Sequence, residues 1–239
     1  MNQLTLRIDP KVLGKYPNLS IACLTAQIDD PSSLNNLVED LTRQVPTIVE
    51  HLNSVEPITQ LPEIAVWRDA YAGMGIKPSK FHSSIEALSR RVKKGDDILT
   101  GLSVVDLYNL TSVLHGTPMG AYDLKKLEGP ELTLRLANPV TDRFEPLGGR
   151  PESYPLNEDL VVYAAGDDIL CWGFNTRDAV ISCVDEASRS IVFLSEATSE
   201  AAAQRPKAAL NALAAQMAEL GITTSDVQIV DSSNPDIGL

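Results

Sequence analysis

The alternation of apolar and polar positions predicts two strands at the start of the chain, followed by a long helix. Apolar residues occupy every second position over residues 4–8, a period typical of a half-buried strand. A second strand is expected over residues 20–27. From residue 34 to residue 52, apolar residues recur every three or four positions, as on one helical face. Ser32 or Ser33 is the expected N-cap, and Pro46 should kink this helix or split it in two.

Residues 104–116 have the clearest helical pattern of the chain. Gly116 provides the left-handed position at which helices often end, and Pro118 prevents the helix from resuming. Asp106 and Asn109 lie three residues apart on this helix and therefore share a stripe. They either bond the local backbone and fix the adjoining loop, or form part of a site. Four residues recur at helical intervals: Val104, Leu107, Thr111 and Leu114.

Further elements follow the same reasoning. Residues 61–73 are expected to be helical, and Ser83 with Glu86 forms a capping box that opens a helix over 84–94, closed by Gly95. Short strands bracketing central helices indicate an α+β fold. The remaining predictions are strands over 132–136, 160–164, 169–174, 180–183, 191–194 and 227–230, a helix over 201–220, and an irregular end over 231–239.

Composition excludes several classes of protein. Hydrophobic residues make up 44% of the 239 residues and charged residues 22%, which is ordinary for a soluble globular protein. Neither a signal peptide nor a membrane span is evident, so we expect a cytoplasmic location and no membrane partner. The three cysteines lack metal-ligand spacing. Reduced thiols are therefore expected, with a Cys171–Cys183 bridge as the less favoured alternative, and neither a metal nor a cofactor is predicted.

The charge distribution is uneven. The net charge is −12, which argues against a general nucleic-acid binder and against DNA as a partner, because neutralising phosphates requires a basic surface. Residues 101–239 hold 9 Lys and Arg against 20 Asp and Glu, whereas residues 1–100 hold 11 against 12. A local basic cluster stands out in the first half: Arg68, Lys77, Lys80, Arg90, Arg91, Lys93 and Lys94.

Common catalytic signatures are absent from the sequence. It contains no phosphate-binding loop, no dinucleotide fingerprint, no nucleophile elbow and no zinc-protease helix. His51 is expected to be solvated on the long helix. His82 and His115 lie at helix ends, where an imidazole can have a purely structural role.

The segment 104–129, VVDLYNLTSVLHGTPMGAYDLKKLEG, is more specific than these general patterns. It contains Val-Val-Asp-x-x-Asn, then Gly-x-Pro-x-x-Ala-aromatic-Asp, then Lys-Leu-x-Gly. In this order the three motifs resemble the signature of the B3/B4 module of the phenylalanyl-tRNA synthetase β subunit. The matching positions are Val104, Val105, Asp106, Asn109, Gly116, Pro118, Ala121, Tyr122, Asp123, Lys126, Leu127 and Gly129. A looser resemblance begins near Trp67, and the resemblance thins after Glu196.

The resemblance implies a fold and an activity. The synthetase module is an α+β fold with a layered β-sandwich core and packed helices, and it hydrolyses tyrosine mischarged onto the phenylalanine tRNA. The rest of the synthetase is absent, so the chain resembles a free-standing member of the family. We expect residues 1–239 to form a single B3/B4-like domain. Its motif-bearing core spans about 67–197, with residues 1–60 and a C-terminal helix over 200–221 as elaborations.

Two departures from the family pattern imply a reshaped pocket. Gly120 stands where the synthetase has a histidine, and Tyr108 stands where it has a threonine, whereas Asn109 is kept. By resemblance, the candidate catalytic residues are Asn109 and Asp106. The candidate substrate-binding residues are Tyr108, Gly120, Ala121, Asp123 and Glu196, with Asp106, Asn109 and Asp123 expected to cluster and Tyr122 to point back toward the helix.

Two functional hypotheses remain open from the sequence. In the first, the basic cluster binds tRNA and the pocket recognises, and hydrolyses, an aminoacyl ester. In the second, the module binds a small amino-acid-like ligand without RNA or catalysis. Residues 175–178, together with residues 194–197, are a candidate second wall of the pocket. Arg135 and Arg177 either hold a carboxylate or phosphate, or form surface ion pairs, and the ion pairs are slightly preferred.

Overall fold

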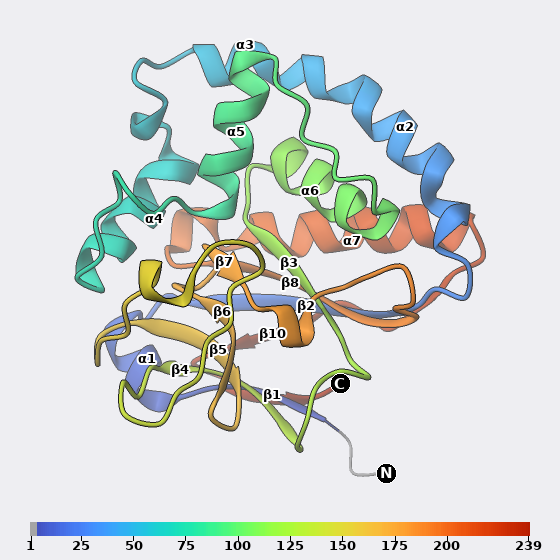
Figure 1. Cartoon of the computed structure of the whole chain (residues 1–239). Coiled ribbons are helices and arrows are strands. Elements are labelled where there is room, and N and C mark those ends of the chain that lie inside the picture. Colours follow the sequence, from blue (N-terminus) through green and yellow to red (C-terminus); the bar gives the residue numbers. More distant parts are fainter. Residues whose placement is uncertain (1–3) are drawn as a thin grey trace.

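The computed structural model describes residues 4–239 and arranges them in three layers. Two β-sheets lie one above the other, and most of the helices cover the outer face of one sheet (Figure 1). Strands β5, β6 and β8 are almost wholly buried, so both of their faces pack against protein. This layered α+β architecture, with a β-sandwich core, confirms the fold class predicted from the sequence.

The first sheet has the strand order β11-β1-β4-β5-β6-β7. Strand β1 runs parallel to β4 and antiparallel to β11, so the two ends of the described chain share one sheet. The pairing of β11 corrects the expectation that residues 231–239 are irregular. The bounds are β1 Thr5–Ile8, β4 Glu131–Leu136, β5 Val161–Ala165, β6 Asp168–Trp172, β7 Arg177–Asp178 and β11 Asp236–Gly238.

The second sheet has the order β10-β2-β8-β3, and β9 also pairs with β2. All of its pairings are antiparallel. Strand β8 lies between β2 and β3, and Gly120 of β3 pairs with Leu194 of β8. The bounds are β2 Ser20–Gln27, β3 Met119–Asp123, β8 Ser190–Ala197, β9 Thr223–Thr224 and β10 Gln228–Asp231.

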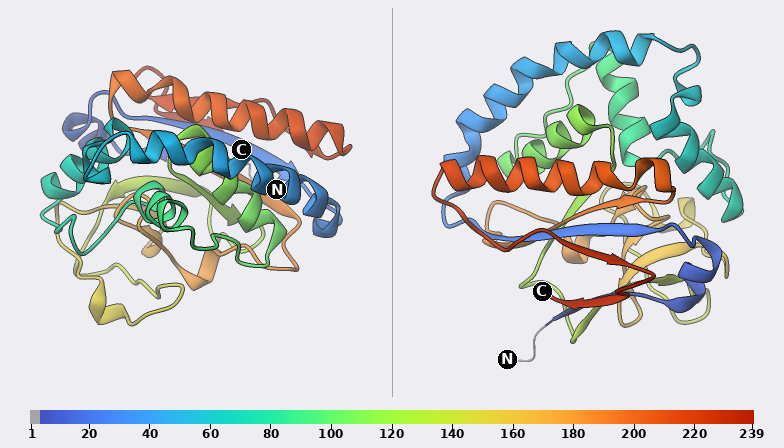
Figure 2. Two further views of the ribbon diagram at one scale, coloured as in Figure 1. Left: turned by 90° about the horizontal axis from the view of Figure 1, so that it is seen from above. Right: turned by 180° about the vertical axis from the view of Figure 1, so that it is seen from behind.

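The α-helices lie mainly above the second sheet. Helix α7 runs along β2 and β8, as the view from behind shows (Figure 2). It buries Leu210, Leu213 and Met217, and each fully buried side chain of this size contributes roughly 1.5–3 kcal/mol. The bounds are α1 Pro10–Lys15, α2 Asn35–Gln44, α3 Val49–Asn53, α4 Pro62–Gly73, α5 Ser84–Lys94, α6 Ser103–His115 and α7 Gln204–Glu219.

Short 3₁₀ turns connect several of these elements. Pro46 does split the predicted long helix, because residues Val45–Ile48 form a 3₁₀ turn between α2 and α3. The expected strand over 180–183 is wrong, since Val180–Ser182 is also a 3₁₀ turn. The other such turns are Pro31–Leu34, Ile58–Gln60, Pro151–Ser153 and Glu200–Ala202.

The helix ends follow the local chemistry of the sequence. Ser83 accepts a hydrogen bond from the Glu86 amide at the start of α5. Gly95 and Gly116 end α5 and α6 with φ of +76° and +60°, a conformation that favours glycine. At residues 30–32 the cap is Asp30, whose side chain accepts from the Ser32 amide at 2.9 Å, so the expected serine cap is corrected.

None of the helices between residues 4 and 239 combines the length and hydrophobicity that crossing a bilayer requires.

Candidate functional site

A cavity of about 90 Å³ lies where α6, β3, β8 and the turn after β6 meet. Two walls come from the motif-bearing segment, and a third comes from residues 171–178. No Lys, Arg or His of the described chain lines it. The lining residues are Ser84, Tyr108, Asn109, Met119, Gly120, Tyr122, Cys171, Phe174, Asn175, Thr176, Asp178, Leu194 and Glu196.

The α6 and β3 walls depend on the turn at Gly116. Helix α6 ends there and the chain enters β3 three residues later, so Asn109 and Gly120 line the same cavity. Tyr108 is buried and makes an edge contact with Phe193, with ring centroids 6.4 Å apart. A methyl group added at Gly120 would meet no atom within 4 Å. The wall at Gly120 is therefore open, whereas the wall at Tyr108 is filled.

Glu196 is the buried acid of the cavity. Its Oε1 accepts a 2.7 Å hydrogen bond from the Tyr163 hydroxyl, and its Oε2 accepts one of 3.3 Å from the Asn175 amide. Burial raises the pKa of Glu196 to about 7, although these two donors act in the opposite direction. The carboxyl group is thus fixed in position and changes charge near neutral pH.

The same hydrogen-bond network reaches α4. Tyr71 donates from its hydroxyl to Asn175 Oδ1 at 2.9 Å and accepts from the Thr176 hydroxyl at 2.8 Å. Because each of these buried polar groups has a partner, the side chain of Asn175 is held with its amide toward Glu196. The network joins the turn after β6 to the helical layer.

Asp178 supplies a second carboxyl group. Burial raises its pKa above the ordinary aspartate value, and burial also raises the pKa of the neighbouring Cys171 thiol. Two acids and no base therefore line one small cavity, which favours a ligand that carries positive charge or donates hydrogen bonds.

Phe174 adds a conformational feature to this wall. It is the one non-glycine residue with positive φ, +60°, in the described part of the chain. A bulky residue rarely adopts this conformation, and such strain concentrates at functional sites. Its ring contacts Trp67 and Tyr16 edge-on, at centroid distances of 5.4 and 5.3 Å, and these contacts hold the strained turn in place.

The structure brings together four of the residues predicted from the sequence. Tyr108, Asn109, Gly120 and Glu196 all line the cavity, and Tyr122 lines it as well. Residues 175–178, expected as a second wall, contribute Asn175, Thr176 and Asp178.

Asp106, Ala121 and Asp123 do not line this cavity, so the expected cluster of Asp106, Asn109 and Asp123 is corrected. Asp106 accepts from the amides of Thr100 and Gly101, at 2.5 and 3.1 Å, and thereby holds the loop before α6. Asp123 accepts from the Lys125 amide and the Ser188 hydroxyl. Ala121 is buried in β3, where it pairs with Phe193 of β8.

Several cavity or network residues escaped prediction, among them Tyr71, Tyr163 and Cys171. Each belongs to a largely apolar stretch, so its position resembles ordinary core. Nothing local marks Tyr163 as a partner of Glu196, since the two are 33 residues apart and lie in different sheets.

The predicted RNA-binding residues are only partly available. Arg68 and Arg90 both pair with the buried carboxylate of Glu86. Lys93 pairs with Glu56, and Arg91 donates to the Asp97 carbonyl. In contrast, Lys77, Lys80 and Lys94 are exposed and make no ion pair with the described residues.

The two arginines considered as anion ligands have other partners. Arg135 binds Asp142 through two hydrogen bonds of 2.8 and 2.7 Å. Arg177 donates to the Leu147 carbonyl at 3.3 Å. For Arg135, the ion-pair alternative favoured from the sequence is therefore the one observed.

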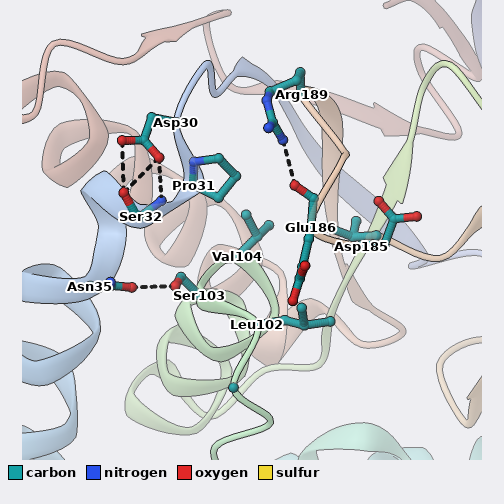
Figure 3. A pocket seen from close by; sticks show the side chains of 12 residues that line it. Asp30, Pro31, Ser32, Asn35, Leu102, Ser103, Val104, Asp185, Glu186 and Arg189 are labelled. Carbon is teal, nitrogen blue, oxygen red and sulfur yellow. Dashed lines mark hydrogen bonds between the residues drawn. The ribbon is translucent and has the colours of Figure 1, made fainter.

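A larger pocket lies at the opposite end of α6, near its N-terminus (Figure 3). Several of its polar side chains already have partners: Asp30 accepts from Ser32, Asn35 bonds Ser103 at 2.5 Å, and Arg189 donates to the Glu186 carbonyl at 2.8 Å. None of the predicted site residues lines it. We therefore regard the smaller cavity as the candidate site.

Comparison with known proteins gives a family and several solved structures, one of which is described here. The family described as the B3/4 domain matches residues 66–230, which extends past Glu196, where the resemblance was expected to thin. An N-terminal fragment of the phenylalanyl-tRNA synthetase β subunit from Pyrococcus horikoshii is 12% identical, with a TM-score of 0.46. The match covers 98% of this chain and 53% of that one. No curated protein matches the chain.

Proposed function

Since the chain belongs to the B3/4 domain family, we propose that it binds the aminoacyl end of a tRNA and hydrolyses the ester. The observation that carries this proposal is the acidic lining of the cavity: Asp178 and Glu196 line it, and no described basic residue does. An aminoacyl ester has an α-ammonium group but no free carboxylate. A free amino acid has both, and its carboxylate would meet two acids in this cavity.

The proposed chemistry depends on positioning. Asn109 lies half-buried at the cavity, and its amide can donate to the ester carbonyl or orient the attacking water. Glu196, held by Tyr163 and Asn175, accepts the ammonium group. An ester is intrinsically labile, so orientation alone supplies a useful part of the barrier reduction. In this proposal Asp106, Ala121 and Asp123 support the site from outside it.

We further propose that the whole chain acts as one domain in the cytoplasm, with Lys77, Lys80 and Lys94 meeting the RNA backbone. These three side chains are exposed, and Lys77 and Lys80 lie in the loop before α5, whose first residue, Ser84, also lines the cavity. Arg68, Arg90, Arg91 and Lys93 contribute less, since each already bonds to the protein.

Deacylation of a panel of aminoacyl-tRNAs tests the proposal. We expect release of at least one small amino acid above the uncatalysed rate, reduced about 10²-fold by Asn109→Ala if its amide stabilises the reacting carbonyl. Asn53→Ala is the matched control, because Asn53 is exposed on α3 and does not line the cavity. If the complete panel stays charged, or both variants behave alike, the proposal fails.

A further inference from the structure

A second cavity of about 250 Å³ opens at the C-terminal end of α6, among α3, α4, α5 and α7. It shares no lining residue with the cavity lined by Asn109 and Glu196, which we call the ester cavity. Its character also differs, because it is lined by one carboxylate, one guanidinium and two imidazoles beside apolar side chains. The residues that matter are Glu63, Arg205, His51, His115, Leu52 and Leu114.

Glu63 is the unusual member of this group. Its side chain is only 4% exposed, and its Oε1 lies 2.5 Å from His51 Nε2. Its Oε2 has no hydrogen-bond partner, and the nearest cation, Arg205 Nη1, is 3.5 Å away. A buried carboxylate oxygen without a donor is costly, and it requires an explanation. A donor supplied by a ligand would satisfy it.

Arg205 faces Glu63 from the first turn of α7. Its Nη1 donates to the Gly116 carbonyl at 3.1 Å, at the end of α6. This approach needs glycine, because a Cβ at position 116 would lie 2.9 Å from Nη1. The Nε and Nη2 atoms of Arg205 make no hydrogen bond with residues 4–239. The guanidinium is therefore anchored on one side and free to bind an anion on the other.

We propose that this cavity binds a free α-amino acid with an apolar side chain. The ammonium group donates to Glu63 Oε2, the carboxylate accepts from Arg205, and the side chain packs toward Leu52 and Leu114. Adjacent opposite charges on the ligand match the adjacent opposite charges of the site. The half-buried His115 adds a polar wall, and burial lowers the pKa of its imidazole, which favours the neutral form.

Binding of L-leucine to the full chain, measured by isothermal titration calorimetry, tests this proposal. We expect saturable binding at one site. L-Leucinamide, which lacks the carboxylate, and 4-methylpentanoate, which lacks the ammonium, should each bind roughly ten- to a hundredfold more weakly, because each loses one charge-assisted hydrogen bond. Absence of saturable leucine binding, or equal binding of the three compounds, overturns the proposal.

The leucine affinities of variants in each cavity show which of the two cavities binds the ligand. Arg205→Met should reduce leucine affinity by a similar factor. Arg150→Met should not, because Arg150 is exposed and does not line this cavity. Asn109→Ala, in the ester cavity, should leave leucine binding intact. The reverse result, with Asn109→Ala sensitive and Arg205→Met insensitive, overturns this proposal independently of the deacylation result. Circular dichroism shows whether Arg205→Met folds. If it does not, the comparison of leucine, leucinamide and 4-methylpentanoate on the wild type still tests the proposal.

Discussion

Glu196 combines full burial with two hydrogen-bond donors, Tyr163 and Asn175. Its pKa is raised from the ordinary value of 4.5 to about 7, chiefly by burial. The folded protein therefore holds this proton more tightly than the unfolded chain. The resulting contribution to stability is complete below about pH 4.5 and is lost as the pH rises through about 7.

The Glu196→Gln variant isolates that contribution. Between pH 4.5 and pH 8 the free energy of unfolding of the wild type should fall by about 1–3 kcal/mol relative to the variant. The neighbouring Asp178, whose pKa is also raised by burial, gives a change of the same sign in both proteins. Urea denaturation at several pH values measures the difference. Parallel stability curves for the two proteins would show that Glu196 does not titrate in this range.

We expect Tyr108 and Gly120 to determine which side chain the cavity accepts. The cavity of about 90 Å³ is bounded by the buried Tyr108 ring, which leaves little room for a tyrosyl group. We expect the wild type to leave mischarged tyrosyl-tRNA intact over the uncatalysed background. Rapid release of tyrosine would contradict this assignment, and Tyr108→Ala, which enlarges the cavity, provides the comparison within the same assay.

At the residue scale, sequence reasoning reached those site residues that lie in a recognisable motif. Asn109 and Gly120 belong to one contiguous segment. Glu196 was proposed because a short stretch around it resembles the synthetase module. Asp106 and Asp123 are not among the residues that line the cavity, and their hydrogen bonds hold neighbouring loops. The bonds of Asp106 to Thr100 and Gly101 are local, and local bonding was one of the two alternatives that the sequence left open. The bond of Asp123 to Ser188, 65 residues away, could not be predicted from residue spacing.

At the element scale, the α6–β3 connection positions both cavities. Gly116 closes α6 in the left-handed conformation and admits the guanidinium of Arg205. The turn could be predicted from the sequence because a glycine followed by Pro118 is a local signal. The contact with Arg205, 89 residues away, could not.

The Gly116→Ala substitution tests this element. We expect it to lower the free energy of unfolding by about 1–2 kcal/mol, the cost of a left-handed residue with a side chain, and also to weaken leucine binding. Gly95→Ala is the matched control, because Gly95 has φ of +76° but a methyl group at position 95 would meet no atom within 4 Å. Its stability loss should be similar, and its leucine affinity unchanged. Equal leucine affinities for the two variants would contradict the placement of Arg205.

Elements that depend on distant partners were predicted less well. The 180–183 segment is apolar enough for a strand, yet it forms a 3₁₀ turn whose Val180 amide bonds to the Glu145 carbonyl. The 236–238 segment forms a strand only because β1 offers it an edge. Local pattern predicts the type of an element well, but not whether a partner edge exists.

At the scale of the whole molecule, charge limits how the protein meets RNA. The net charge is −12, so binding to tRNA should be weak and steeply dependent on salt. Neutralising Lys77, Lys80 and Lys94 together should reduce the slope of log affinity against log salt by about 0.7–0.9 per lost phosphate contact. Filter binding measures the slope.

A matched set of lysines provides the control for this prediction. Lys11, Lys125 and Lys207 are also exposed and belong to α1, the turn after β3, and α7. Neutralising them makes the same change in net charge, so an equal effect on the slope would show that total charge matters and that the lysines near α5 have no specific role.

The α+β class was predictable at this scale, because strands bracket the central helices along the sequence. The strand order was not, since β1 pairs with β4 and β2 pairs with β8 across more than a hundred residues. The cavity depends on that order: β8 brings Glu196 beside β3, whereas residues 175–178 come from the edge of the other sheet.

The central claim is that an acid-lined cavity recognises the ammonium group of an aminoacyl ester. The most direct test compares deacylation of one aminoacyl-tRNA substrate with that of its N-acetylated form by the wild-type protein. Acetylation removes the positive charge and keeps the ester. The account predicts hydrolysis of the N-acetyl form at least about tenfold more slowly, corresponding to the loss of one charge-assisted hydrogen bond. Equal rates for the two substrates would contradict it.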